Sequence, residues 1–214
     1  MRRIPFIAAA LSLLISGPCF AQEWIEYASQ KDFFTVNFPS EPKVEDITYT
    51  TEYRLTLPGR VYRAADGPNR YSVTVIDYTQ AEKMHAERNK ECKATDAYPD
   101  ICGDRSRADL RGAMVWATFH FLQRDAKVTF YAVYNADLVE GHQLQLTNAD
   151  GSRTFAAIHM HENRLYIFEG TVPKGAPQPA LFQQSLGFID KEGKRIRYTA
   201  TYSNAYPAPA RLPR

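Results

Sequence analysis

The stretch that most constrains the fold of this chain is residues 153–172, which predicts two strands joined by a tight turn at Glu162 and Asn163. Strand side chains alternate between the two faces of a sheet. One face should be buried, because it carries the aliphatic side chains Ile158, Met160, Leu165 and Ile167. The other face should be mixed, with His159, His161, Arg164, Tyr166 and Phe168. An isolated hairpin is only marginally stable in water, so this one must belong to a larger sheet.

Short extended segments separated by turn residues fill most of the remaining chain. Alternation predicts strands at 34–38, 43–53, 60–64 and 71–78, with turns at Pro58-Gly59 and at 66–69. Residues 80–93 lack Pro and Gly and predict a helix, which residues 104–111 could extend. Strands resume at 114–122, pairing with 127–135, and at 142–148, and residues 179–185 predict a short helix. The predicted class is α+β, a predominantly antiparallel sheet with meanders on both sides of a central helix and two or three helices packed on it.

The first residues have the pattern of an export signal. Arg2 and Arg3 precede an apolar run at 4–15 that is too short to span a bilayer comfortably. Small residues at Cys19 and Ala21 favour cleavage after Ala21. The alternative is a lipoprotein acylated on Cys19, although Pro18 stands where a small residue would be expected. We therefore predict a periplasmic or secreted protein with no transmembrane segment in its mature chain.

Removal of residues 1–21 leaves 193 residues, a length that suits one domain or two small ones. We expect a single domain at 22–202, and a disordered tail at 203–214 in which three prolines follow Tyr206. The signal also holds two of the 26 basic residues, so the mature chain has 24 basic and 24 acidic residues. A balanced charge argues against general nucleic-acid binding.

Two cysteines, Cys92 and Cys102, remain in the mature chain. An even pair in an exported protein predicts a disulfide, which would stabilise the fold by roughly 2–3 kcal/mol. The alternative is a metal or redox site formed by the two thiols. Their separation is too wide for a Cys-x-x-Cys motif, and no histidine lies between them.

Both ends of the predicted domain resemble small exported bacterial proteins of the PsbP-like group. The resemblance is carried by "WIEYASQKDFFTVNFPSEP" at 24–42, by "NRLYIFEGTVP" at 163–173 and by "FQQSLGF" at 182–188. It implies an antiparallel sheet with helices packed on it. The segment between Cys92 and Cys102 is not part of the family pattern, and no catalytic residue carries over from the family.

His159 and His161 are the sharpest candidates for a chemical site, because two histidines at i and i+2 of a strand point the same way and can share a zinc or copper ion. Further ligands would have to come from Glu162, His142 or His120. The structural alternative is that the two imidazoles pack beside Tyr166 and Phe168. No phosphate loop, dinucleotide fingerprint or H-E-x-x-H motif is present in the sequence, and we predict no cofactor.

These patterns predict a non-enzymatic binding or assembly module of the cell envelope. Its partner would be an envelope protein or a small ligand, held on one sheet face or in the groove beside the helix. The many aromatic residues, 13 Tyr, 12 Phe and 2 Trp, favour a binding surface over an active site. The alternative function is a metal-dependent or hydrolytic enzyme centred on His159 and His161. The sequence leaves the oligomeric state open.

Overall fold

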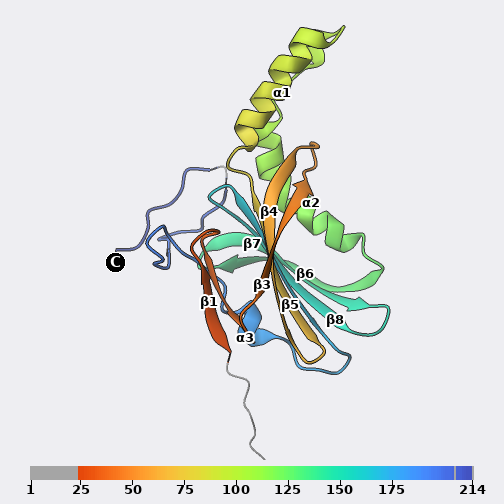
Figure 1. Ribbon diagram of the computed structural model, residues 1–214, viewed down its shortest axis with the longest axis vertical. Coiled ribbons are helices and arrows are strands. Elements are labelled where there is room, and N and C mark those ends of the chain that lie inside the picture. The colour runs from red at the N-terminus through yellow and green to blue at the C-terminus, as the bar shows by residue number, and fades with distance from the viewer. Residues whose placement is uncertain (1–23, 205, 214) are drawn as a thin grey trace, which may run out of the picture.

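The computed structural model describes residues 24–204 and 206–213, and it confirms an α+β fold built on antiparallel sheets (Figure 1). The predicted export signal and Cys19 lie outside the described residues. A three-stranded sheet has the order β1-β2-β10, and a seven-stranded sheet has the order β3-β4-β5-β9-β8-β7-β6. The strands are β1 (Ile25–Ser29), β2 (Phe34–Phe38), β3 (Lys43–Thr50), β4 (Thr56–Asp66), β5 (Asn69–Asp77), β6 (Ala126–Ala136), β7 (Val139–Asn148), β8 (Arg153–His161), β9 (Arg164–Val172) and β10 (Gly187–Phe188).

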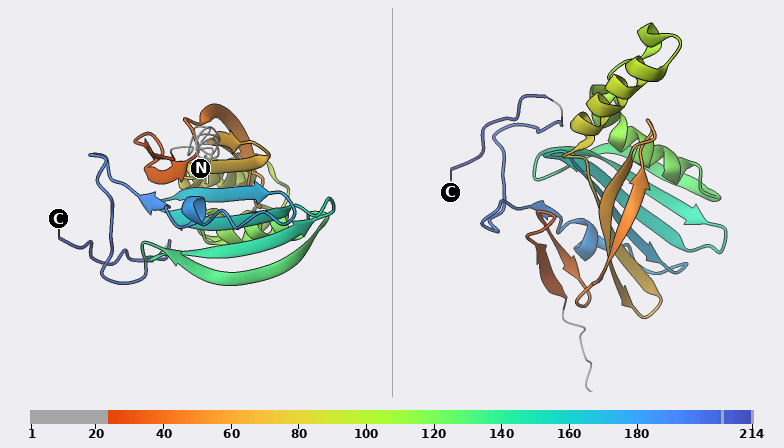
Figure 2. Two further views of the ribbon diagram at one scale, coloured as in Figure 1. Left: turned by 90° about the horizontal axis from the view of Figure 1, so that it is seen from below. Right: turned by 45° about the horizontal axis from the view of Figure 1, so that its top comes forward.

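The two faces of the seven-stranded sheet are covered by different elements. α2 lies across one face, and the three-stranded sheet lies against the other (Figure 2). α1 projects beyond the end of the sheet (Figure 1). None of the helices within the described residues combines the length and apolar character that a membrane span requires. The helices are α1 (Ala81–Thr95), the 3-10 turn η1 (Pro99–Ile101), α2 (Ser106–Leu122) and α3 (Ala180–Gln183).

The hairpin predicted at 153–172 is confirmed in its register. β8 pairs with β9, and His161 lies opposite Arg164. Glu162 and Asn163 form the turn with φ of +46° and +57°. Positive φ at both turn residues gives the primed geometry that matches the natural twist of two antiparallel strands.

The burial predicted for this hairpin is wrong for one of its two faces. Ile158 and Leu165 are fully buried under α2, as expected. His159 and Tyr166, on the face expected to be mixed, are also 0% exposed, because the three-stranded sheet covers them. The periodicity of two fixes which residues share a face, but it does not show whether a second layer packs on the polar-looking one.

The strand predicted at 114–122 is wrong, because these residues form the second half of α2. Ala113, Ala117 and Phe121 are buried and lie four residues apart, which is the spacing of one helix face. Short apolar runs fit both periods, and here the helical stripe is the one that packs on the sheet. Residues 126–136 consequently pair with β7 as strand β6.

The turn predicted at Pro58-Gly59 is also wrong, since both residues lie inside β4. Pro58 pairs with Thr48 of β3, but the pairing of β4 with β5 begins only at Gly59, so the missing N–H of Pro58 removes no bond on that side. Gly59 is needed for close approach, because a Cβ there would lie 2.7 Å from the carbonyl oxygen of Val75. The chain instead reverses at residues 51–55, between β3 and β4.

Part of the C-terminal segment predicted to be disordered contacts the hairpin turn. The Thr199 amide donates to Ala210 over 2.9 Å, and the Leu212 amide donates to Arg197 over 2.8 Å. Arg211 forms an ion pair with Glu162. These contacts place residues 210–212 beside the end of β8, while the domain boundary at residue 202 stays a prediction.

Gly141 of β7 offers a test of how tightly β7 and β8 are packed. A Cβ at this position would lie 2.2 Å from His159 Nδ1 and 2.5 Å from the carbonyl oxygen of Ile158. We expect Gly141→Ala to lower the free energy of unfolding by about 2–3 kcal/mol, since the core must shift to admit the methyl group. Gly103→Ala is the control, because nothing lies within 4 Å of its added Cβ. Equal urea midpoints for the two variants would contradict this packing.

Candidate functional site

His159 and His161 lie in the core between the two sheets, with exposed fractions of 0% and 1%. The His161 ring packs against Phe188 of β10 at 4.5 Å and against Tyr202 at 4.8 Å. The His159 ring lies 6.1 Å from Phe188. Tyr134 of β6 lies 6.3 Å from the His159 ring as well. The two imidazoles are thus surrounded by Tyr134, Phe188 and Tyr202, and an ion could reach them only through packed side chains.

Burial keeps both imidazoles neutral. It lowers the pKa of His159 to about 4 and that of His161 to about 3, and the nearby charge of Arg211 acts in the same direction on His161. His159 Nδ1 lies 3.2 Å from the carbonyl oxygen of Val139, and His161 Nε2 lies 2.7 Å from the Tyr198 hydroxyl. The second nitrogen of each ring is buried without a hydrogen-bond partner among the described residues.

The other predicted ligands do not converge with this histidine pair. His142 lies on the opposite face of the sheet, where its Nδ1 is 2.7 Å from the Thr118 hydroxyl of α2. His120 packs on Trp116 at the surface of α2. Glu162 pairs with Arg211. Within residues 24–204 and 206–213, neither histidine belongs to a group of three or more potential metal ligands, so a metal site at His159 and His161 stays a hypothesis.

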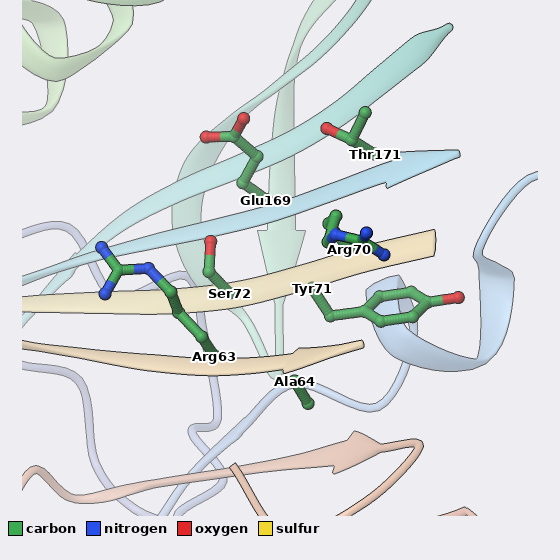
Figure 3. Close-up of a pocket in the computed structure, with 7 residues that line it drawn as sticks. All are labelled: Arg63, Ala64, Arg70, Tyr71, Ser72, Glu169 and Thr171. Atoms are coloured by element: carbon green, nitrogen blue, oxygen red, sulfur yellow. The ribbon is translucent and has the colours of Figure 1, made fainter. Parts of the chain in front are cut away.

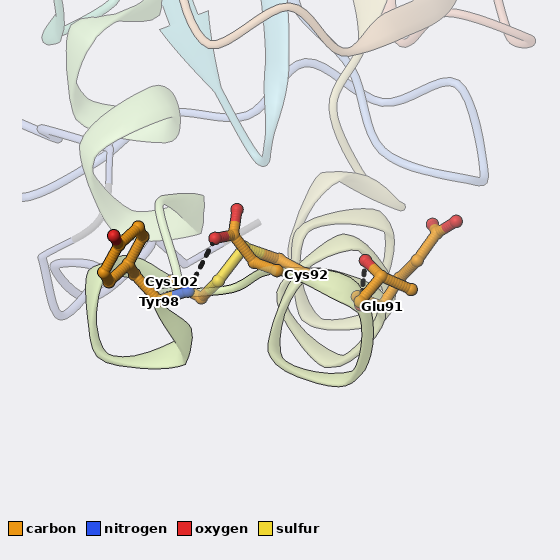
Figure 4. Close-up of a disulfide and its surroundings, with 6 residues drawn as sticks. Glu91, Cys92, Tyr98 and Cys102 are labelled. Carbon is orange, nitrogen blue, oxygen red and sulfur yellow. Dashed lines mark hydrogen bonds between the residues drawn. A yellow bond between two sulfur atoms is a disulfide. The ribbon is translucent and has the colours of Figure 1, made fainter.

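The structure joins Cys92 and Cys102 in a disulfide, as the cysteine count predicts (Figure 4). Their Cα atoms lie 5.9 Å apart, within the usual range for a disulfide. The bond ties the end of α1 to the residue that follows η1. Asp96 lies close to both sulfur atoms, but cysteines paired with each other offer no thiolate to an ion. The disulfide therefore fixes the projecting end of the helical pair.

A shallow depression of about 270 Å³ lies over β4, β5 and β9. Figure 3 shows Arg63, Ser72 and Glu169 on these neighbouring strands, pointing to the same side. Glu169 forms a two-pronged ion pair with Arg124 at 2.7 and 2.9 Å, and Arg63 pairs with Glu45. Because these charges already have partners, the depression offers no convergent set of free groups for catalysis.

Two buried carboxylates hold layers of the fold together. Asp32, 2% exposed, accepts hydrogen bonds from Arg60 and Tyr62 of β4 and so fixes the turn between β1 and β2. Asp109 of α2 lies 2.8 Å from His85 Nε2 of α1 and accepts a hydrogen bond from Thr51 at 2.7 Å. Sequence reasoning missed both networks, because their members lie 24 to 58 residues apart and form no local motif.

The most unusual surface lies along β6, which is one edge of the seven-stranded sheet and pairs only with β7. α2 packs mainly on β7, β8 and β9 of this sheet. Four apolar side chains of β6 are exposed by 37–68%, namely Val128, Phe130, Tyr131 and Val133. We call these four residues the apolar edge.

α2 adds a second row of exposed apolar groups. Its outer side carries Val115, Phe119 and Leu122, which are 59%, 45% and 41% exposed. Residues spaced by four and then three positions form one continuous helix stripe. We call these three residues the α2 ridge. They lie on the side of α2 opposite to Ala113, Ala117 and Phe121, which pack on the sheet.

The opposite edge of the same sheet has a different chemistry. β3 carries Lys43, Glu45 and Asp46, all exposed, whereas Lys127 is the single charged residue of β6. Charges on an edge strand discourage pairing with another chain, and an unprotected apolar edge invites it. The apolar edge is therefore the surface of this fold that is best suited to a partner.

Comparison with solved structures finds nine matching chains. The structure is similar to the solution structure of cyanobacterial PsbP (CyanoP) from Synechocystis sp. PCC 6803, with 10% sequence identity and a TM-score of 0.45. The match covers 81% of this chain and 96% of that one. No family model matches the chain, and no curated protein sequence does.

The buried histidines predict how stability depends on pH. Their pKa values in the folded protein lie below the unfolded value of about 6.5, so between these values the unfolded chain binds more protons. The two neutral histidines therefore make their whole contribution to the free energy of unfolding above pH 7. As the pH drops towards 5, the free energy of unfolding falls by on the order of 2–4 kcal/mol. Burial lowers the pKa of half-buried His142 as well, which acts in the same direction.

Urea unfolding at several pH values checks this expectation. The variant His161→Gln should show a shallower fall between pH 7 and pH 5, because it lacks one of the groups that must stay neutral. His120→Gln is the control, since it also removes a histidine but at an exposed position. A wild-type stability that is constant from pH 7.5 to pH 5 would contradict the buried, neutral state of the pair.

Proposed function

We propose that this protein is a non-enzymatic binding or assembly module of the cell envelope that docks on a partner protein through the apolar edge. The observation that carries the proposal is the contrast between the two edges of the seven-stranded sheet. β3 is charged, whereas β6 presents exposed apolar side chains beside an unpaired backbone. Exposed apolar patches on a stable domain mark interaction sites.

The backbone of β6 supports docking by strand addition. β6 contains no proline, and after the irregularity between Val128 and Phe130 it pairs regularly with β7 up to Ala136, so a partner segment in an extended conformation could continue the hydrogen-bond ladder along residues 130–136. Side chains on the two faces of the edge would then supply specificity. Tyr131 and Val133 lie on the face that carries α2, and Phe130 lies on the opposite face.

The titratable groups favour binding over catalysis. The buried histidines lie inside the core, and Asp32 and Asp109 bind groups of the protein itself. An acid–base or nucleophilic site needs such groups to converge where a substrate can enter. A binding module needs only an exposed surface of the right chemistry, and the apolar edge is one.

We infer export from the first residues, which lie outside the described part of the chain. Arg2, Arg3 and the apolar run at 4–15 have the pattern of a signal peptide, and a disulfide between Cys92 and Cys102 suits an oxidising compartment. A periplasmic or secreted protein with an apolar docking surface would meet its partner in the envelope.

The docking surface is tested by placing a charge on each edge of the sheet in turn. Val133→Lys on β6 should abolish capture of the partner from an envelope extract, because a lysine in the ladder would be buried without a counter-charge. Val44→Lys on β3 is the matched control, since Val44 is also exposed on an edge strand. Both variants should keep the wild-type stability within about 0.5 kcal/mol. If Val133→Lys captures the same partner as Val44→Lys, the apolar edge is not the docking surface.

The compartment is tested by the intact mass of the protein recovered from the periplasm or the medium. The mass should correspond to a chain that begins at Gln22 and is two hydrogens lighter than the fully reduced form, since Cys92 and Cys102 pair. After treatment with a reductant, the two hydrogens should return. A protein that stays in the cytosol with residues 1–21 attached would contradict export.

A further inference from the structure

We propose that the occupant of the apolar edge is the β6 strand of a second copy of this chain. The two strands would run antiparallel across a two-fold axis and would join two seven-stranded sheets into one continuous sheet. This inference rests on the proposed function and names its partner.

The backbone of β6 is ready for such pairing. β6 and β7 are joined by a two-residue turn at Asp137 and Leu138, both with positive φ, and Ala136 pairs with Val139 across it. In a hairpin of this kind the closing pair is hydrogen-bonded, as is every second pair beyond it, and the residues between these pairs turn their N–H and C=O groups away from the partner strand. The outward groups thus belong to Asn135, Val133 and Tyr131, and they form an open ladder.

The side chains of β6 complement a second copy of themselves. In a register centred on Ala132, Tyr131 would lie opposite Val133 of the second copy, and Phe130 would lie opposite its Tyr134. Aromatic pairs and pairs of an aromatic with a β-branched residue are among the favourable cross-strand combinations. The outward-facing residues would then pair with outward-facing residues, so the ladder and the side chains agree on the same register.

The charges on β6 do not oppose this register. The regular part of the strand, residues 130–136, carries no charged side chain, so no like charges would meet across the two-fold axis.

The oligomeric state of the purified exported protein tests the inference. Analytical ultracentrifugation should give twice the mass of the chain. Val133→Lys should sediment as a monomer, because the two lysines would lie diagonally across the axis on the same face of the joined sheet, and Val44→Lys should remain a dimer. Circular dichroism of each variant shows whether it is folded. A wild-type dimer that Val133→Lys leaves intact would place the interface elsewhere and overturn the proposal.

A cysteine at the centre of the register gives an independent test. Ala132→Cys would place two thiols opposite each other in a pair without hydrogen bonds, where Cα atoms lie about 4.5 Å apart and a disulfide can form. Air oxidation should convert this variant to a covalent dimer, and Thr48→Cys on the exposed edge of β3 should stay uncrosslinked. A Thr48→Cys variant that crosslinks as readily as Ala132→Cys would overturn the specificity of the contact.

The outcomes separate this inference from the proposed function. If the wild-type protein is a monomer at every concentration and Ala132→Cys does not crosslink, pairing with a second copy is wrong. The proposed function would still stand if Val133→Lys loses a different protein from the envelope extract while Val44→Lys retains it. If neither variant changes mass or capture, both ideas fail.

Discussion

The rest of the structure depends on one constraint, which is that the central strands of the seven-stranded sheet are apolar on both faces. Ile158 and Leu165 point to one side of the β8–β9 hairpin, and Tyr166 and Phe168 point to the other, and all four are at most 2% exposed. A sheet of this kind needs a layer on each side, because a bare face would leave large side chains in water. α2 supplies one layer, and β1, β2 and β10 with the C-terminal segment supply the other. The two halves of the sequence are thereby bound into one unit.

This double burial explains why the histidine pair does not behave as its sequence spacing indicates. On a solvated strand face, His159 and His161 would be open to an ion. Under a second layer they become core residues whose neutral forms are favoured, since a charge would lose its hydration. The same layer buries Asp32, and its carboxylate is accommodated by the Arg60 guanidinium and the Tyr62 hydroxyl. The burial of each of these polar groups therefore depends on the layer that covers the sheet.

The sequence predicted what local geometry dictates and missed what depends on distant packing. The hairpin register and the turn at Glu162 and Asn163 follow from alternation and turn chemistry, and both were predicted. The helix at 114–122 was missed, because Val115, Ala117, Phe119 and Phe121 alternate as strand residues do. Only the neighbouring sheet decides that Ala117 and Phe121 face inward together. The apolar edge was missed for the same reason. The sequence predicted that residues 114–122 pair with 127–135 as a strand, and β6 becomes an edge only because residues 114–122 are helical instead.

The missing pairing of β6 turns an ordinary strand into the feature that bears on function. With residues 114–122 folded as a helix, the sheet ends at β6, whose largely apolar composition is typical of a strand with a neighbour on each side. An edge of this composition risks uncontrolled association, and β3 shows that this same sheet carries charged residues on its other edge. An edge that is apolar where the opposite edge is charged is most simply explained by an occupant that covers it. Conflict between a local rule and the fold is expected at functional positions, and β6 is a strand of this chain where such a conflict occurs.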